Sequence, residues 1–200
     1  MRPALLVAAV CLLPIPAFAQ GSQSFVQGFG GLRLAAAPTA TPIAGATVGI
    51  GLMPYLQVVG EVGHMGDVLP ATTQTLLSVS PIGFHRSATY GEGGLRLTTS
   101  PVGHVGVYGE TLFGAARISS SVSGLGSVRN DVLANLALRF VSTTSRMGSV
   151  GTGVTLQGGP LIATFGYRYS RIFPSNAFDS LLMGGHADIN EGRVSFGFRF

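Results

Sequence analysis

Apolar residues recur at every second position along several stretches of this chain, and this period of two constrains the fold more than any other feature. It is clearest at the C-terminus, where residues 194–200 are apolar at each even position and charged or small at each odd one. Runs with the same period cover residues 56–62, 150–157 and 163–170. Successive side chains of a β-strand point to opposite faces, so these runs predict strands with one apolar face.

A second feature argues against a helical membrane span in the N-terminal half. No charged residue occurs between Arg33 and Glu61, an interval long enough to cross a bilayer as a helix. Several glycines and the prolines Pro38, Pro42 and Pro54 interrupt it. A helix in lipid needs its backbone hydrogen bonds intact, so two strands joined by a turn fit this segment better.

Counted along the chain, the alternating runs predict eight strands. They cover residues 24–34, 44–53, 55–65, 88–98, 104–117, 147–157, 160–172 and 190–200. Short turns alternate with longer connections, which is typical of a transmembrane barrel. The predicted fold is therefore all-β, an eight-stranded antiparallel up-and-down transmembrane β-barrel with both termini on the short-turn side. Two long connections could carry short helices, near 70–78 and 130–140, although the second is also compatible with a strand.

The composition indicates that most of the surface does not face water. Only 10% of the residues are charged, against about 25% in an ordinary soluble domain. The formal net charge is +4, and the 12 basic residues, all arginine, are scattered singly. Because no basic run or stripe occurs, we expect no nucleic-acid partner.

The N-terminus is typical of an export signal. An arginine precedes an apolar stretch over 4–13, and residues 17–19 (Ala-Phe-Ala) form a small-x-small cleavage site. We therefore expect residues 1–19 to be a cleaved signal peptide and residues 20–200 to form the barrel domain. The apolar stretch is too short for a transmembrane anchor. Cys11 lies inside this stretch and is a poor lipid-attachment site; as it is the only cysteine, we expect no thiol chemistry in the mature chain.

From Gln23 to Phe200 the chain resembles the small outer-membrane β-barrels typified by the OmpA-type transmembrane domain. The likeness is carried by the closing strand Arg193–Phe200, by Gly166-Tyr167-Arg168-Tyr169, and by Gly28-Phe29-Gly30-Gly31. A terminal phenylalanine after alternating aromatic residues is similar to that family's barrel-assembly signal, which the resemblance assigns to Phe196, Phe198 and Phe200. It implies a location in the cell outer membrane, contact with outer-membrane lipid, and folding by the barrel-assembly machinery.

Alternation alone does not decide which face of each strand points into the barrel. A soluble lipocalin-like barrel has the same period with its apolar residues inside. Low charge, glycine-rich strands and the aromatic C-terminus favour the opposite arrangement, with the apolar residues toward lipid. The charged residues that then line the lumen are Arg33, Glu61, Glu92, Arg96, Glu110, Arg168, Glu191, Arg193 and Arg199.

These lumen residues have two interpretations. An eight-stranded barrel is only wide enough for side chains to fill it, and buried charges need partners, which favours a plug of ion pairs. The alternative is an ion path lined by the same groups. We predict a lumen ion-pair network in which Arg96 lies between Glu92 and Glu110.

Aromatic residues are predicted to mark the two membrane interfaces, where an apolar ring with a polar hydroxyl is favourable. Tyr55 and Phe200 are expected near the short-turn end of the barrel, and Tyr90 near the opposite end.

A hydrolytic site at the rim is a third interpretation. His186-Ala187-Asp188 comes just before the last strand, and nucleophilic hydrolysis would need a serine such as Ser170 or Ser180 beside this histidine. Nothing in the sequence marks either serine, and the position where lipid A deacylases carry their serine is Asp188 here. We therefore do not expect an enzyme.

The remaining histidines, His64, His85 and His104, are dispersed without metal-ligand spacing, and no cofactor motif occurs. We expect neither a metal nor a cofactor. The expected function is that of an integral outer-membrane protein with a structural or surface-interaction role, as a monomer. A narrow or gated pore for small solutes is the alternative, and the extracellular partner is left open.

Overall fold

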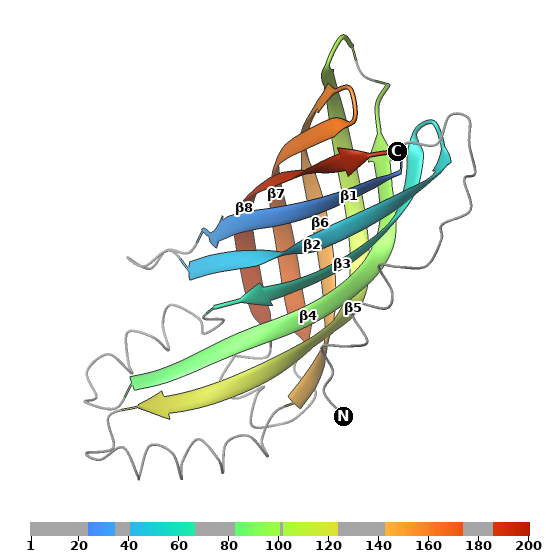
Figure 1. The fold of residues 1–200 in the computed structure, drawn as a ribbon. Coiled ribbons are helices and arrows are strands. Elements are labelled where there is room, and N and C mark those ends of the chain that lie inside the picture. The colour runs from blue at the N-terminus through green and yellow to red at the C-terminus, as the bar shows by residue number, and fades with distance from the viewer. Residues whose placement is uncertain (1–23, 35–40, 67–82, 101, 124–142, 174–185) are drawn as a thin grey trace, which may run out of the picture.

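The computed structural model describes residues 24–34, 41–66, 83–100, 102–123, 143–173 and 186–200. Their eight antiparallel strands close into one barrel, in which each strand pairs with its neighbours in sequence and β8 pairs with β1 (Figure 1). The strands are β1 (Phe25–Arg33), β2 (Thr41–Met53), β3 (Leu56–Met65), β4 (Gly83–Thr98), β5 (Val105–Ser123), β6 (Thr143–Gly158), β7 (Leu161–Phe173) and β8 (Ala187–Arg199). The predicted eight-stranded antiparallel barrel is confirmed. The predicted loop helices and the predicted signal peptide lie outside the described residues.

Three strands extend at least four residues further toward the long connections than the sequence pattern predicted. β4 begins at Gly83, β5 continues to Ser123, and β6 begins at Thr143. The added part of β5 is rich in serine, so its two faces do not differ in polarity and alternation cannot reveal it. The ends of β4 and β5 project beyond the other strands (Figure 1).

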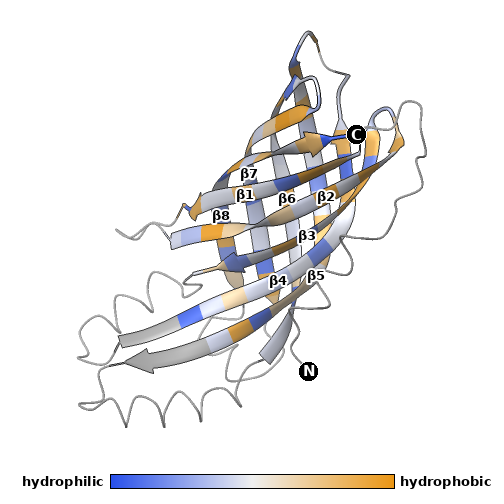
Figure 2. Cartoon of the chain, viewed as in Figure 1, coloured by the Kyte–Doolittle hydropathy of each residue, from blue (hydrophilic) through white to orange (hydrophobic). Residues whose placement is uncertain are grey.

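The outer surface of the barrel is apolar, whereas its interior holds buried polar and charged side chains among apolar ones. Val62 is 56% exposed, whereas its neighbour Glu61 is 3% exposed. Hydrophobic and hydrophilic residues alternate in this way along the strands (Figure 2). This is the inside-out arrangement, and it contradicts the soluble lipocalin-like alternative. Among the described residues, no helix has the length and apolarity needed to cross a membrane.

Two of the short turns depend on glycine. Gly103, between β4 and β5, has φ 65°, and Gly159, between β6 and β7, has φ 60°. This left-handed region is open to glycine without strain, so both turns can be tight.

Aromatic side chains that point into the barrel lie over glycines of the neighbouring strand. Each glycine is the direct register partner of its aromatic residue, and the pairs are Phe25–Gly49, Phe29–Gly45, Tyr90–Gly63 and Tyr108–Gly153. A Cβ atom on Gly49 would approach the Phe25 ring to 2.1 Å, and one on Gly63 would lie 2.5 Å from the Tyr90 hydroxyl. The rings therefore occupy the space that a side chain at the glycine would need. We call these four pairs the aromatic–glycine joints.

From β1 to β8, direct register partners lie progressively farther from the short turns. When partners are followed strand by strand from Phe25, at the short-turn end of β1, they lead to Ile189, near the long-connection end of β8. A closed barrel of tilted strands requires such a stagger. Residues that are direct partners therefore lie at different heights along the barrel axis.

Candidate functional site

The predicted lumen residues line the interior of the barrel. Those on the strands that are at most 9% exposed are Arg33, Glu61, Glu92, Arg96, Glu110, Arg168, Glu191 and Arg193. Arg199 lies apart from them, at the short-turn mouth, where it donates hydrogen bonds to the Gln157 side chain and to the carbonyl of Gly159.

Arg168, on β7, is the centre of the charged layer. Its Nη1 lies 2.6 Å from Glu61 Oε1 on β3, and its Nη2 lies 2.5 Å from Glu110 Oε1 on β5. Glu92 Oε2, on β4, is 3.5 Å from Nη1, and Glu191 Oε1, on β8, is 3.8 Å from Nε. Since β7 and β3 are on opposite sides of an eight-stranded barrel, one guanidinium group bridges the lumen.

Arg193, on β8, shares Glu61 with Arg168. Its Nη1 lies 2.8 Å from Glu61 Oε1, and its Nε lies 2.6 Å from Glu191 Oε1. The guanidinium carbon is 4.1 Å from the centroid of the Phe29 ring, a favourable cation–π distance. An arginine that donates several hydrogen bonds in this way neutralises a buried carboxylate and also provides donors for its oxygen atoms.

Arg96, on β4, forms a second centre nearer the short turns. Its Nε and Nη2 donate hydrogen bonds of 2.9 and 2.7 Å to Glu110 Oε2, its direct register partner on β5. The guanidinium carbon also lies between the rings of Phe25 and Tyr108, at 4.7 and 4.5 Å from their centroids.

Glu92 does not join Arg96, contrary to the prediction. Four residues along a strand correspond to roughly 13 Å, so a shared face does not bring the two side chains together. Glu92 instead accepts a 2.7 Å hydrogen bond from the Ser149 hydroxyl and lies beside Arg168.

Tyr90 points into the lumen, so its predicted place on the lipid-facing surface is wrong. It lies two residues before Glu92 and therefore shares that residue's face of β4. Its hydroxyl donates a 2.8 Å hydrogen bond to Glu61 and accepts one from Arg193.

The outer face near the long connections carries other tyrosines. Tyr167 donates to the side chain of Asn190, and Tyr169 donates to Asp188 at 2.7 Å. Tyr55 and Phe200 are exposed at the short-turn end, as expected for that interface.

Arg86 is a lumen residue that the predicted strand bounds leave out. It lies on β4, is 2% exposed, and precedes residue 88, where that strand was predicted to begin. It shares the parity of Glu92 and Arg96, so extending the strand would have found it. Arg33, at the long-connection end of β1, is the register partner of Glu191.

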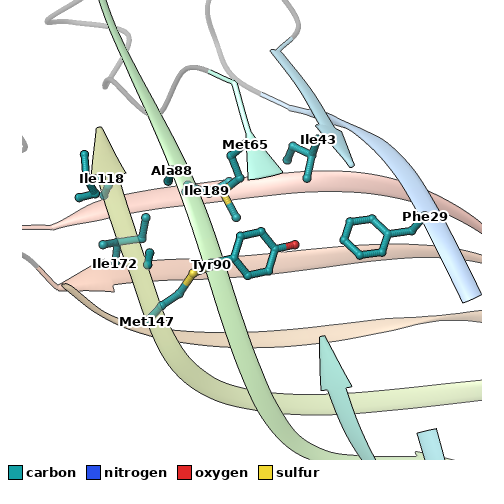
Figure 3. Packing of buried hydrophobic residues seen from close by; sticks show 11 residues of the cluster. Phe29, Ile43, Met65, Ala88, Tyr90, Ile118, Met147, Ile172 and Ile189 are labelled. Carbon is teal, nitrogen blue, oxygen red and sulfur yellow. The ribbon is translucent and has the colours of Figure 1, made fainter. Parts of the chain in front are cut away.

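Two clusters of buried apolar residues border the charged layer. Phe25, Val59, Leu112 and Ile162 form a small one beside the Arg96–Glu110 pair. Toward the long connections a larger cluster fills the barrel (Figure 3); it consists of Phe29, Ile43, Met65, Ala88, Tyr90, Ala116, Ile118, Met147, Ile172, Ala187 and Ile189. The sequence pattern does not reveal this outer apolar layer, because isolated inward-facing Ile and Met residues do not stand out against a lipid-facing surface of similar composition.

The rim does not assemble a hydrolytic triad from the residues that the structure describes. His186 Nε2 lies 3.3 Å from Asp188 Oδ2, and Asp188 faces outward, where Arg171 also binds it. Ser170 is fully buried on the lumen face and hydrogen-bonds to Ser149, so the wall of the barrel separates it from this pair. Ser180 lies outside the described residues. Within the described ranges, no group of three His, Cys, Asp or Glu residues could hold a metal ion.

The chain matches no protein-family model and no curated protein. In fold it is similar to Ail, the attachment invasion locus protein of Yersinia pestis, with 14% identity, a TM-score of 0.52, and coverage of 91% of this chain and 100% of Ail. Neisserial surface protein A is similar at 14% identity and a TM-score of 0.54, over 90% of this chain and 96% of that protein. The chain has the fold of the small outer-membrane β-barrels.

A third member of this fold is the N-terminal barrel domain of Pseudomonas aeruginosa OprF. It has 13% identity and a TM-score of 0.53, over 90% of this chain and 98% of that domain. At such identities the likeness concerns the backbone. What distinguishes the present outer-membrane-type barrel must therefore be sought in its own side chains.

Proposed function

We propose that this chain is an integral outer-membrane protein with a structural or surface-interaction role at the cell envelope, and that its barrel does not conduct solutes. The apolar outer surface supports insertion into lipid, because large exposed residues such as Val150, Phe165 and Phe196 cover the strands on that side. The four long connections all leave the barrel at the same end, opposite the short turns. They would stand together on one side of the membrane, where a partner can reach them.

The closed interior is the observation that carries the non-conducting role. An ion moving along the axis would have to displace Arg168 from Glu61 and Glu110, and these contacts are 2.6 and 2.5 Å long. It would then have to cross the outer apolar layer, where mostly apolar side chains would have to replace the water around the ion at a large cost in free energy. An ion would have to pass both barriers in turn, the ion pairs of Arg168 and the outer apolar layer. Opening one of them would therefore leave the path closed by the other.

Export and assembly belong to the same proposal. Removal of residues 1–19 would leave the barrel domain, 20–200, in the periplasm. The alternating Phe196, Phe198 and Phe200 on the lipid face of β8 would then be available to the barrel-assembly machinery. The barrel closes within a single chain, which supports a monomer.

Planar-bilayer conductance of the refolded chain tests the proposal. We expect wild type to give no well-defined current steps. A variant that opens both barriers, Met65→Gly with Met147→Gly and Arg168→Gln, should leak, whereas the lipid-facing control Val62→Gly should behave as wild type. Well-defined steps from wild type would contradict the proposal and favour the narrow or gated pore.

A further inference from the structure

The outward-facing arginines gather on one wall of the barrel. Among the described strand residues that face outward, the arginines are Arg117 on β5, Arg146 on β6 and Arg171 on β7, which are adjacent strands. The outward positions of β1 to β4 in the same described part carry no Arg, Asp or Glu. We call these three residues the arginine belt.

The register brings the arginine belt to nearly one height. Arg146 lies two residues nearer the short turns than Thr144, the partner of Arg117, and Arg171 lies two residues nearer than Phe173, the partner of Arg146. Direct register partners lie progressively farther from the short turns from β5 to β7. The shift of two residues toward the short turns at each step compensates for this. Diagonal neighbours of this kind are about 7–8 Å apart, within reach of long side chains. The three arginines are therefore diagonal neighbours on adjacent strands.

Part of the arginine belt is oriented by the protein itself. Arg171 donates hydrogen bonds of 2.7 Å from Nε and 3.1 Å from Nη2 to the carboxylate of Asp188. Its guanidinium carbon also lies 5.7 Å from the centroid of the Tyr169 ring. Asp188 neutralises the charge of Arg171, whereas the described outward positions of β5 to β7 carry no Asp or Glu beside Arg146, so this wall is positively charged there.

A groove opens in the lipid-facing surface just below the arginine belt, toward the short turns. It has a volume of about 400 Å³ and is lined by Gly148, Phe113 and Tyr169, with Arg171 and Phe173 at its upper edge. A Cβ atom on Gly148 would meet the Phe113 ring at 3.4 Å, so this glycine forms the floor against which the ring rests. The groove is thus apolar where a hydrocarbon chain would lie and cationic where that chain would reach the membrane surface.

We propose that this wall binds a phosphorylated lipid of the outer leaflet, with one acyl chain in the groove over Gly148 and the phosphate on the arginine belt. Arginine is suited to phosphate because its planar group donates paired hydrogen bonds to the oxygens. The positive charge of the wall is opposite to the negative charge of the phosphate. The groove lies next to the arginine belt, as an acyl chain lies next to the headgroup of the same lipid. The proposal rests on the outer-membrane location proposed above, since it requires the long-connection end to face the outer leaflet.

Retention of defined lipids tests the site. The full mature chain is refolded into phosphatidylcholine vesicles that contain diphosphoryl lipid A or its dephosphorylated form, extracted mildly, and examined by native mass spectrometry. We expect wild type to retain the diphosphoryl form in preference. Replacing Arg117, Arg146 and Arg171 by glutamine should weaken this retention by about tenfold or more, because each hydrogen bond to a charged group typically corresponds to at least one such factor.

The groove has a matched control on the opposite wall. Gly148→Leu should fill the floor and reduce retention of both lipids, whereas Gly60→Leu, at an outward glycine of β3, should leave retention unchanged. Should the triple variant fold poorly, as judged by heat-modifiable migration on a gel, the single variant Arg146→Gln gives the same comparison with a smaller loss.

Several results would overturn the proposal. Equal retention of the two lipids by wild type would mean ordinary contact with surrounding lipid, and an unchanged preference in a folded arginine variant would place the headgroup elsewhere. Abolition of retention by inorganic phosphate alone would indicate a site for soluble anions. Failure of wild type to insert into vesicles would contradict the proposed membrane function, and the lipid site with it.

Discussion

Arg168 holds a position in which a neutral side chain would leave several carboxylates facing one another. Glu61, Glu110 and Glu92 approach it from three strands, and its side chain is 2% exposed. Burial of charge without a partner is far more costly than burial of a pair. The stability of the barrel interior should therefore depend on this one guanidinium more than on any surface ion pair.

Replacement of Arg168 by methionine tests this dependence. We expect the free energy of unfolding in vesicles, measured by urea titration, to fall by about 3–5 kcal/mol, because the carboxylates stay buried without their cation. The control is Arg171→Met, at an exposed pair with Asp188, which should cost little stability because solvent screens such a pair. A loss at Arg168 no larger than the loss at Arg171 would mean that water or rearrangement satisfies the carboxylates.

At the scale of residues, the sequence predicts which side chains face the lumen. It does not predict which of these side chains contact one another. The period of two placed Glu61, Arg96 and Arg168 on the inner face correctly. Partners depend on the stagger between strands, and no local pattern encodes that stagger. Glu92 was therefore paired with the wrong arginine, and the bridging role of Arg168 could not be foreseen.

The sequence pattern locates each individual strand, but it does not show where the strand ends. Strand number and direction followed from alternation and from the short turns, and all eight strands are where the sequence predicted them. Their ends at β4, β5 and β6 were underestimated because alternation stops where both faces become polar. In the glycine-rich central parts, alternation identifies each strand by itself. The aromatic–glycine joints cannot be predicted from a single strand, because each joint also needs a glycine on the partner strand.

The joints predict which glycines tolerate a side chain. Gly49→Val should lower the folded fraction on a heat-modifiability gel, since its Cβ would approach the Phe25 ring to 2.1 Å. Overpacking of this kind typically costs about 1–3 kcal/mol. Gly30→Val is the matched control, because nothing lies within 4 Å of a Cβ there and the position faces outward. Equal folded fractions for the two variants would show that the Phe25 ring can move aside.

The last strand predicts a difference between assembly in cells and folding in vitro. Phe200 is 62% exposed, and its backbone N–H donates a hydrogen bond to the Ser24 carbonyl at the β1–β8 seam. If the terminal phenylalanine is read by the assembly machinery, Phe200→Asp should reduce folded barrel in the outer membrane at low expression. Refolding of the same variant into vesicles should be much less affected. An equal loss in both settings would assign Phe200 a structural role only.

The whole molecule combines an apolar exterior with an interior closed by side chains from every strand. All four glutamates of the sequence lie in the lumen, and the aspartate that the structure describes, Asp188, lies on the outside near the rim. Such a partition suits a barrel whose wall must be uncharged in lipid. The architecture could be predicted because it follows from composition and period together, whereas its cellular role depends on connections that one sequence does not explain.

Export of the whole chain makes a prediction about its N-terminus. The Ala17-Phe18-Ala19 site should be cleaved, so that protein purified from membranes begins at Gln20. Intact mass spectrometry gives the result directly, and an Ala19→Leu variant should be retained in its longer form. A mature chain that still carries residues 1–19, or a lipid on Cys11, would contradict the proposed signal peptide.

The placement of the aromatic–glycine joints bears on how such a protein can diversify. They lie at the β1–β2, β3–β4 and β5–β6 seams, which are the hairpins closed by long connections, whereas the hairpins closed by short turns have their register set by the turn itself. A ring seated on a glycine fixes the alignment of its two strands from within, whatever segment joins them outside. The long connections are thus free to gain, lose or exchange residues over generations without shifting the wall beneath them, and the same freedom would make this barrel a tolerant host for grafted surface loops.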